Sequence, residues 1–291
     1  MKYHLNNEVY RLNIIIMMRE MTTREIQMVS LDILKDVHEF CVENNIKYTL
    51  FSGTLIGAIR HHGFIPWDDD LDIAFTRPEY EKFVRLYKSK KGYKLFARER
   101  QGKDVFLAYT RICEMEKTYV DDSYFPWTLE EKGVWIDVFP LDGAESDYNL
   151  AVKQCEEFYK IWRTSCRVRR SMIPFSYCEG LYGKFKLLGK KIVFGSRMGI
   201  WDKHIKMCKR IPFEEAEYYS HHAWAGFKMR EYYKTSAFDD YFLQPFEDGE
   251  FYVMKGYDGA LRAKYGDYMQ LPPEEEQCPC HSFNKFYWKD K

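Results

Sequence analysis

The strongest constraint on this sequence is an acidic cluster that runs directly into an apolar segment. Asp68–Asp70 are followed by Leu71, Asp72 and Ile73. Two carboxylates about 4 Å apart repel each other by about 4 kcal/mol at an effective dielectric constant of ~20. A fold that contains this cluster must offset the repulsion, and a divalent cation is a common means of doing so.

Strand alternation sorts these residues onto two faces. In an extended strand Asp68, Asp70 and Asp72 point to one face. Leu71 and Ile73 then face the core, and Asp69 points away from the other aspartates. Oxygen ligands without nearby cysteine favour magnesium or manganese over zinc. The alternative is a solvated acidic turn, but the apolar continuation to Phe75 favours a metal site.

A second segment carries one isolated carboxylate. Gly133–Pro140 is typical of a short apolar strand, and its Asp137 lies between Ile136 and Val138. The aspartate should therefore emerge on the face opposite these two side chains. If this strand pairs beside the first acidic one, Asp137 completes a site of three carboxylates, as a metal ligand or as a proton acceptor.

A glycine turn precedes the acidic cluster. Ser52, Gly53 and Thr54 lie where a strand meets a helix, and glycine allows close backbone approach to a phosphate. Arg60 could bind phosphate oxygens through its fork of donors, or form a surface salt bridge with an aspartate. The next polar side chains are further candidates for donor binding: His61, His62 and Trp67.

The remaining pattern predicts alternating helices and strands. Thr22 and Glu25 form a capping-box signature for a helix that ends near Asn44, and Pro78 suits the first turn of another helix. Further elements are expected at 48–51 (strand), 55–60 (helix), and 105–113 and 118–121 (a strand pair).

Composition restricts the class of protein. Lys and Arg number 44 against 44 Asp and Glu, and no nucleic-acid motif accompanies the charge, so we expect no nucleic-acid partner. The eight cysteines are scattered apart from Cys278-Pro279-Cys280-His281, which indicates reduced thiols. The apolar run around Ile14–Met18 is too short to cross a bilayer. We therefore expect a cytoplasmic protein.

Charge concentrates in the middle of the chain. Residues 160–210 contain 14 Lys and Arg against two acids, Glu179 and Asp202. The composition of this region is typical of helices. Their basic faces are either ordinary solvated surfaces or a surface that contacts anionic lipid headgroups or a polyanionic acceptor. A peripheral contact with the inner face of the membrane is one expectation.

These blocks resemble a known family. Residues 53–60 (GTLIGAIR) and 63–73 (GFIPWDDDLDI) resemble the LicD family of the nucleotidyltransferase superfamily, whose distant members include the fukutin-related proteins. Residues 136–142 (IDVFPLD) resemble its second block, and 257–273 its C-terminal block. Ile59 and His62 depart from the family pattern, which often has Val and Lys there.

The resemblance implies a fold and a reaction. The fold would be α+β, with a mixed nucleotidyltransferase-like sheet flanked by helices. Four regions are expected: an extension (1–22), a catalytic core (23–145), a helical basic region (146–245), and a C-terminal block that packs on the core (246–291). The reaction would be metal-dependent transfer of a phospho-substituent from a CDP-linked donor, CDP-choline above all. The acceptor would be a hydroxyl of a cell-surface glycan or its lipid-linked precursor.

Two alternatives stay open. The same site could transfer a nucleotide from a triphosphate and release pyrophosphate, because both reactions cleave a pyrophosphate bond on the same metals. The chain could also be a non-catalytic binding protein, although Asp70, Asp72 and Asp137 are all present.

Overall fold

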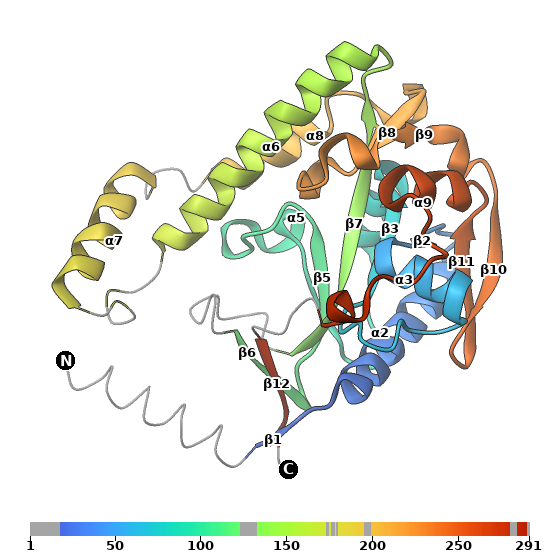
Figure 1. Ribbon diagram of the computed structural model, residues 1–291, viewed down its shortest axis with the longest axis horizontal. Helices are drawn as coiled ribbons and strands as arrows, with labels where there is room; N and C mark the ends of the chain where they lie inside the picture. The colour runs from blue at the N-terminus through green and yellow to red at the C-terminus, as the bar shows by residue number, and fades with distance from the viewer. Residues whose placement is uncertain are drawn as a thin grey trace.

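The computed structural model describes residues 18–122, 133–172, 175, 178, 180–194, 199–279 and 284–289 (Figure 1). A curled mixed sheet forms its centre, and its strands are β2 (Thr49–Leu50), β3 (Asp72–Thr76), β4 (Lys94–Phe96), β5 (Thr110–Glu114), β7 (Val134–Ala144), β8 (Tyr218–Ser220) and β9 (Tyr233–Lys234). The strand order is β2-β3-β7-β5-β4, and β8 joins β7 and β9. Within this order β3 and β7 are parallel, whereas β2–β3, β7–β5 and β5–β4 are antiparallel.

Two smaller sheets complete the strands. One has the order β1-β12-β6 and contains β1 (Arg19–Glu20), β6 (Thr118–Asp122) and β12 (Asn284–Trp288), so it joins the two ends of the described chain. The other is the hairpin of β10 (Tyr241–Phe246) and β11 (Gly249–Met254).

The helices lie around the central sheet, except for the helix at residues 180–194, which lies apart from it (Figure 1). They are α2 (Thr23–Glu43), α3 (Ser52–Ile56), α4 (Arg77–Leu86), α5 (Arg98–Gln101), α6 (Tyr148–Ser171), α7 (Gly180–Phe194), α8 (Ile200–Cys208) and α9 (Tyr257–Tyr265). A π-helical turn, η1 (Gly57–His61), continues α3. Short 3-10 turns are η2 (Gly102–Asp104), η4 (Phe213–Glu215), η5 (His222–Trp224), η6 (Lys228–Glu231), η7 (Thr235–Phe238) and η8 (Glu274–Glu276).

The first long helix begins where its capping signature predicts. Thr22 is the N-cap of α2, and its backbone N–H donates a hydrogen bond to the Glu25 carboxylate at 2.9 Å. Its apolar face is fully buried, with Leu31, Ile33 and Leu34 at 0% exposure. Burial of each such side chain contributes about 1.5–3 kcal/mol. The helix therefore forms one wall of the core behind the sheet.

Helix α4 supports the parallel strand pair. It follows β3 directly, with a proline in its first turn as predicted, and it packs against both β3 and β7. Phe83 on α4 stacks on Phe75 of β3 with ring centroids 4.8 Å apart. This packing fixes the strand that carries the acidic residues.

Several predicted elements require correction. The segments at 105–113 and 118–121 do contain β5 and β6, but they do not pair with each other: β5 pairs with β4 and β7, and β6 with β12. The predicted helix at 55–60 begins earlier, at Ser52. The first acidic strand begins only at Asp72, so Asp68–Leu71 precede it rather than alternate within it.

The basic region is only partly helical. Helices α6, α7 and α8 occupy its first part, but its second part contains β8, β9 and β10. Because β8 pairs with β7, this part extends the central sheet. The expected boundary at 245/246 falls within β10, so the β10–β11 hairpin crosses it. The division into four regions otherwise stays a prediction.

A second apolar cluster fixes the long helix α6 to α8. It is formed by Phe158, Ile161, Cys208 and Ala225.

Every cysteine whose state the structure describes is a free thiol, namely Cys41, Cys113, Cys155, Cys166, Cys178, Cys208 and Cys278. Among the described helices none is long and apolar enough to cross a bilayer.

Candidate active site

The register of the two parallel strands places two aspartates side by side. Asp72 on β3 is the direct partner of Asp137 on β7. The residues that flank them, Ile73, Ile136 and Val138, are fully buried. Adjacent strands lie about 4.8 Å apart, so the two carboxylates share one face of the sheet. This geometry confirms the predicted pairing of the acidic strands.

Like charges and burial both act on this pair. Burial raises the pKa of Asp72 well above its ordinary value, and the negative charges of Asp70 and Asp137 raise it further. Asp70 therefore belongs to the same electrostatic cluster. The three acidic residues predicted from two separate segments lie together, although their roles remain predictions.

Asp68 and Asp69 lie in the turn before β3. Both side chains are buried. Asp69, which is expected to point away from the other aspartates, is therefore not exposed to solvent. Burial raises the pKa of Asp68 to about 6, although a hydrogen bond with Asp70 opposes the shift. A Cβ added at Gly53 would lie 2.7 Å from Asp68 Oδ2, so only glycine leaves room for this carboxylate.

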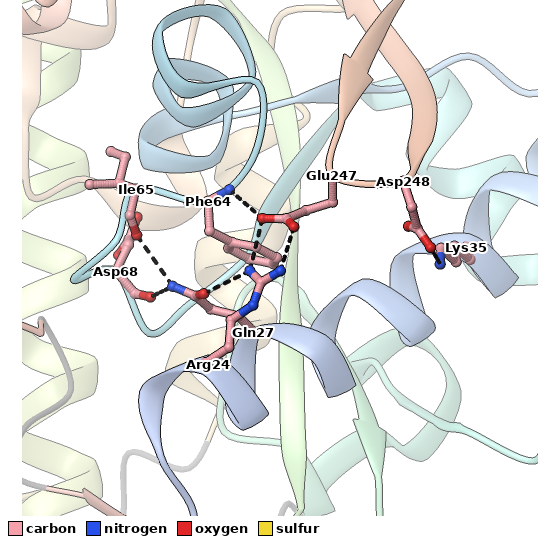
Figure 2. Close-up of polar contacts among 8 residues, drawn as sticks. All are labelled: Arg24, Gln27, Lys35, Phe64, Ile65, Asp68, Glu247 and Asp248. Carbon is pink, nitrogen blue, oxygen red and sulfur yellow. Dashed lines mark hydrogen bonds and ion pairs between the residues drawn. The ribbon is translucent and has the colours of Figure 1, made fainter.

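A network from two other elements holds the backbone of the acidic turn (Figure 2). The buried amide of Gln27 on α2 donates to the carbonyl oxygens of Ile65 at 3.2 Å and Asp68 at 2.7 Å. Glu247, in the β10–β11 turn, accepts from the backbone N–H of Phe64 at 3.0 Å and pairs with Arg24. The turn is therefore fixed from both sides.

Arg111 is a site residue that the sequence patterns did not reveal. It is the cross-strand partner of Asp137 on β5, and its Nε lies 2.7 Å from Asp137 Oδ1. Its guanidinium also lies over the Trp135 ring, 4.5 Å from the centroid. One signal was present, a single arginine inside the apolar strand Thr110–Glu114, but its meaning depends on a strand order that local patterns do not specify.

Lys264 brings a second cation from the C-terminal part of the chain. Its Nζ donates to Glu231 Oε1 at 2.5 Å and to Ser52 Oγ at 3.1 Å, and its side chain is only 7% exposed. Burial lowers its pKa, but the charges and hydrogen bonds of Glu231 and Tyr265 together outweigh this, and the pKa lies above the ordinary lysine value. The ammonium is close enough to Asp72 to lower the pKa of that carboxyl.

Glu231 and His221 complete this cluster. Glu231 Oε1 lies 3.4 Å from His221 Nδ1, and both side chains are buried. Burial acts to raise the pKa of Glu231, yet the electrostatic and hydrogen-bond interactions with His221 and Lys264 together bring it below its ordinary value. The ionised carboxylate thus holds the Lys264 ammonium at the edge of the acidic pair.

The predicted phosphate turn has an unusual backbone. Ser52 has a φ of 52°, in the left-handed region that non-glycine residues rarely adopt. In this conformation its hydroxyl forms a hydrogen bond with the Tyr265 hydroxyl at 2.6 Å, and Tyr265 is the last residue of α9. The Thr54 hydroxyl accepts from the Asp72 backbone N–H at 2.8 Å and so fixes the acidic strand. Donor binding by Ser52, Gly53 and Thr54 stays a prediction.

Arg60 and its neighbours lie between the turn and the C-terminal block. The Arg60 guanidinium donates to the carbonyl oxygens of Tyr268 at 2.5 Å and Gln270 at 3.1 Å. The His61 ring packs edge-on against Trp67, and the exposed His62 adopts a left-handed conformation with φ 57°. These described contacts tether the C-terminal block, and roles of these residues in donor binding stay predictions.

The C-terminal block is only partly described. Gly266, with φ 71°, ends α9, which agrees with a structural turn at Tyr265–Asp267. Cys280 and His281 lie outside the described residues.

The carboxylates of the site suit a hard cation, but by themselves they do not form a complete set of metal ligands. Over the described ranges, which omit 1–17, 123–132 and shorter gaps, no group of three or more His, Cys, Asp or Glu is arranged to hold a metal ion. Mg²⁺ is commonly bound by one or two carboxylates together with waters and substrate phosphates. Asp70 and Asp72 fit that pattern, because a cation between them would relieve the repulsion that raises the Asp72 pKa. Asp137 already has Arg111 as its counter-ion.

Comparison with known proteins identifies the class to which this site belongs. A family model described as "LicD/FKTN/FKRP, nucleotidyltransferase domain" matches residues 45–178, which include the aspartates of the candidate site, Asp68, Asp69, Asp70, Asp72 and Asp137. The chain belongs to the LicD family of phosphotransferases. Lys264, Glu231 and His221 lie outside the segment that the family model matches.

A relative matches nearly the whole chain. The lipopolysaccharide cholinephosphotransferase LicD of Haemophilus influenzae is 32% identical over 281 residues, covering 91% of this chain and 97% of that protein. Shorter matches join it to two uncharacterized proteins. One, from Rickettsia typhi, is 46% identical over 65 residues, which cover 22% of this chain and 21% of that protein. The other, from Rickettsia prowazekii, is 63% identical over 47 residues, which cover 16% of this chain and 18% of that protein.

Proposed function

We propose that this enzyme transfers a phospho-substituent, phosphocholine in the first instance, from CDP-choline to a hydroxyl of a cell-surface glycan or its lipid-linked precursor. The observation that carries the proposal is the pairing of Asp72 with Asp137, flanked by Lys264 and Arg111. The name of the Haemophilus relative supports choline phosphate as the transferred group and lipopolysaccharide as the kind of acceptor.

The strand topology supports a nucleotidyltransferase-like core. A short strand, β2, pairs antiparallel with β3, and β3 pairs in parallel with β7, so that one acidic residue comes from each strand of the parallel pair. Gly53, in the first turn of α3, lies against Asp68 in the turn before β3. We infer from this order that the donor diphosphate lies over the carboxyl face of β3 and β7.

The reaction requires positive charge more than it requires a covalent intermediate. The acceptor oxygen attacks the phosphorus that bears the choline, the bond from this phosphorus to the bridging oxygen breaks, and CMP leaves. Lys264 and Arg111 stabilise the developing charge on the phosphate oxygens. The acceptor proton passes to a carboxylate, for which we propose Asp137, the cross-strand partner of Asp72.

A magnesium or manganese ion would be held by Asp70 and Asp72, with Asp68 and Asp137 as auxiliary ligands. When bound, it would neutralise charge on the diphosphate oxygens and align the attacking and leaving atoms. Removal of metal with a chelator should stop turnover without unfolding the protein, and return of magnesium should restore it.

The test separates this reaction from its alternatives. The full chain is incubated with CDP-choline and a glycan acceptor, and separately with CTP. Release of CMP with choline phosphate on the acceptor supports the proposal, whereas release of pyrophosphate from CTP identifies a nucleotidyltransferase. If calorimetry detects neither donor nor magnesium binding, the protein is a non-catalytic binding protein.

Two variants assign the chemistry to the site. Asp72→Asn should abolish CMP release while the thermal transition is retained, because the substitution removes one charge from a repelling cluster. Asp248→Asn is the matched control, since that side chain is 65% exposed and pairs only with Lys35 among its described contacts. Equal activity of Asp72→Asn and the control would contradict the assignment.

A further inference from the structure

Helix α7 exposes the side chains that an amphipathic helix normally buries. Leu181, Phe185, Leu188 and Ile192 follow one another at intervals of four, three and four residues, so they form one stripe on the helix. Their exposed fractions are 76%, 69%, 43% and 73%. Tyr182 and Val193 widen the stripe and are also exposed.

The opposite side of α7 provides its attachment to the protein. Leu187 is the buried residue of this helix, at 4% exposure, and α7 packs against α6. Figure 1 shows α7 beyond the end of α6, apart from the central sheet. Monomeric soluble proteins rarely expose an apolar surface of this kind without a partner. The stripe is therefore an interaction surface.

The charge of the helix indicates which partner covers it. Helix α7 contains Lys184, Lys186, Lys190 and Lys191 and no acidic residue. At 100° per residue, Lys184 and Lys191 lie along one edge of the stripe, and Lys186 and Lys190 lie on the polar side. An apolar stripe bordered by lysines is typical of helices that lie in the interface of an anionic bilayer.

We propose that α7 docks this protein onto an anionic lipid surface, with Leu181, Phe185, Leu188 and Ile192 inserted below the headgroups. A second copy of the chain is a poorer occupant, because four lysines from each α7 would meet. This mode of attachment does not require a helix that spans the bilayer. The proposal goes beyond the phosphotransferase reaction and does not depend on it, since vesicle binding requires no donor or acceptor.

The test measures binding of the full chain to vesicles. Vesicles of phosphatidylglycerol and phosphatidylcholine should bind the protein, and vesicles of phosphatidylcholine alone should bind it weakly. Phe185→Ser with Ile192→Ser should lower the affinity at least about tenfold, because two large side chains no longer leave water. Lys184→Gln with Lys191→Gln should lower it roughly 25-fold, since each lysine contributes about fivefold near an anionic surface.

Controls separate docking from general effects of substitution. Val42→Ser removes an apolar side chain that is 51% exposed on another helix, α2, and should leave binding unchanged. Tyr182→Trp should show a blue shift of its fluorescence only when anionic vesicles are added. All variants should keep the wild-type thermal transition and CMP release from soluble substrates.

Three outcomes would overturn the proposal. One is failure of the wild-type chain to bind anionic vesicles. Another is equal binding by wild type and by the Phe185→Ser, Ile192→Ser variant. The third is a wild-type dimer that these two substitutions convert to a monomer without any vesicle binding, which would identify the stripe as a subunit interface.

Discussion

Two aspartates on one strand should respond in opposite ways to the same substitution. Asp137 and Asp142 are both on β7, and each pairs with an arginine. Asp142 is fully buried and binds Arg77 through both carboxylate oxygens, at 2.6 and 2.9 Å. Asp137 binds Arg111 but also adjoins the acidic cluster. We expect Asp142→Asn to affect stability and Asp137→Asn to affect activity.

The magnitudes follow from the neighbouring charges. Removal of one partner from a buried ion pair costs about 3–5 kcal/mol. Arg77 has no other described partner to replace Asp142, because its second terminal nitrogen, Nη1, is already buried without a hydrogen-bond partner. For Asp137, attraction to Arg111 and repulsion from Asp72 are each up to about 4 kcal/mol at a dielectric constant of ~20 and have opposite signs. They largely cancel, so the free energy of unfolding should change by roughly 1 kcal/mol or less.

The assay compares unfolding and turnover in both variants. Urea unfolding should show the loss in Asp142→Asn, and its melting temperature should fall by roughly 6 °C or more. Turnover per folded molecule should remain near wild type in Asp142→Asn and fall at least ~100-fold in Asp137→Asn. The reasoning is refuted if Asp137→Asn is destabilised as much as Asp142→Asn, or if folded Asp142→Asn is inactive.

Other substitutions test the supports of the site. Lys264→Met should destabilise the fold, because it leaves the buried Glu231 carboxylate without its ammonium partner, and should lower turnover per folded molecule at least ~10-fold. Lys264→Arg should restore part of both, as urea unfolding and CMP release measure, and wild-type turnover per folded molecule in Lys264→Met would exclude a role for this ammonium. Gln27→Leu leaves two buried carbonyls unpaired and should cost about 1–3 kcal/mol in urea unfolding, against no change for Lys35→Met at an exposed pair. Burial lowers the pKa of His204 and of His222 to about 4, so their neutral forms favour the folded state fully above pH 6.5. Stability should then fall as pH drops from 6.5 towards 4, by about 1.4 kcal/mol per unit for each histidine, and a flat urea midpoint over that range would contradict it.

Local pattern was sufficient to predict the acidic pair. Asp137 lies between Ile136 and Val138, and Asp72 between Leu71 and Ile73, and all four apolar neighbours are fully buried. Because side chains alternate in a strand, buried neighbours determine the face of the aspartate. The capping box of Thr22 and the proline at the start of α4 were equally local signals, and both helices begin where they indicate.

Contacts between distant segments could not be predicted in this way. Lys264 lies in an ordinary amphipathic segment, and its partners Ser52 and Glu231 are brought to it by tertiary packing. Arg111 acquires its role only because β5 lies beside β7. The strands β8 and β9 were also missed, because each is only two or three residues long and alternation needs a longer run to be recognised.

The contact between Ser52 and Lys264 has a consequence for how the protein is made. The two residues are 212 positions apart, so the acidic strands emerge from the ribosome long before the ammonium that faces them. A nascent chain can form α2, β3 and α4 early, but it has to wait for α9 before this edge of the site closes. Catalytic competence would therefore appear late in synthesis, and a product truncated before residue 264 would be folded in part yet inert.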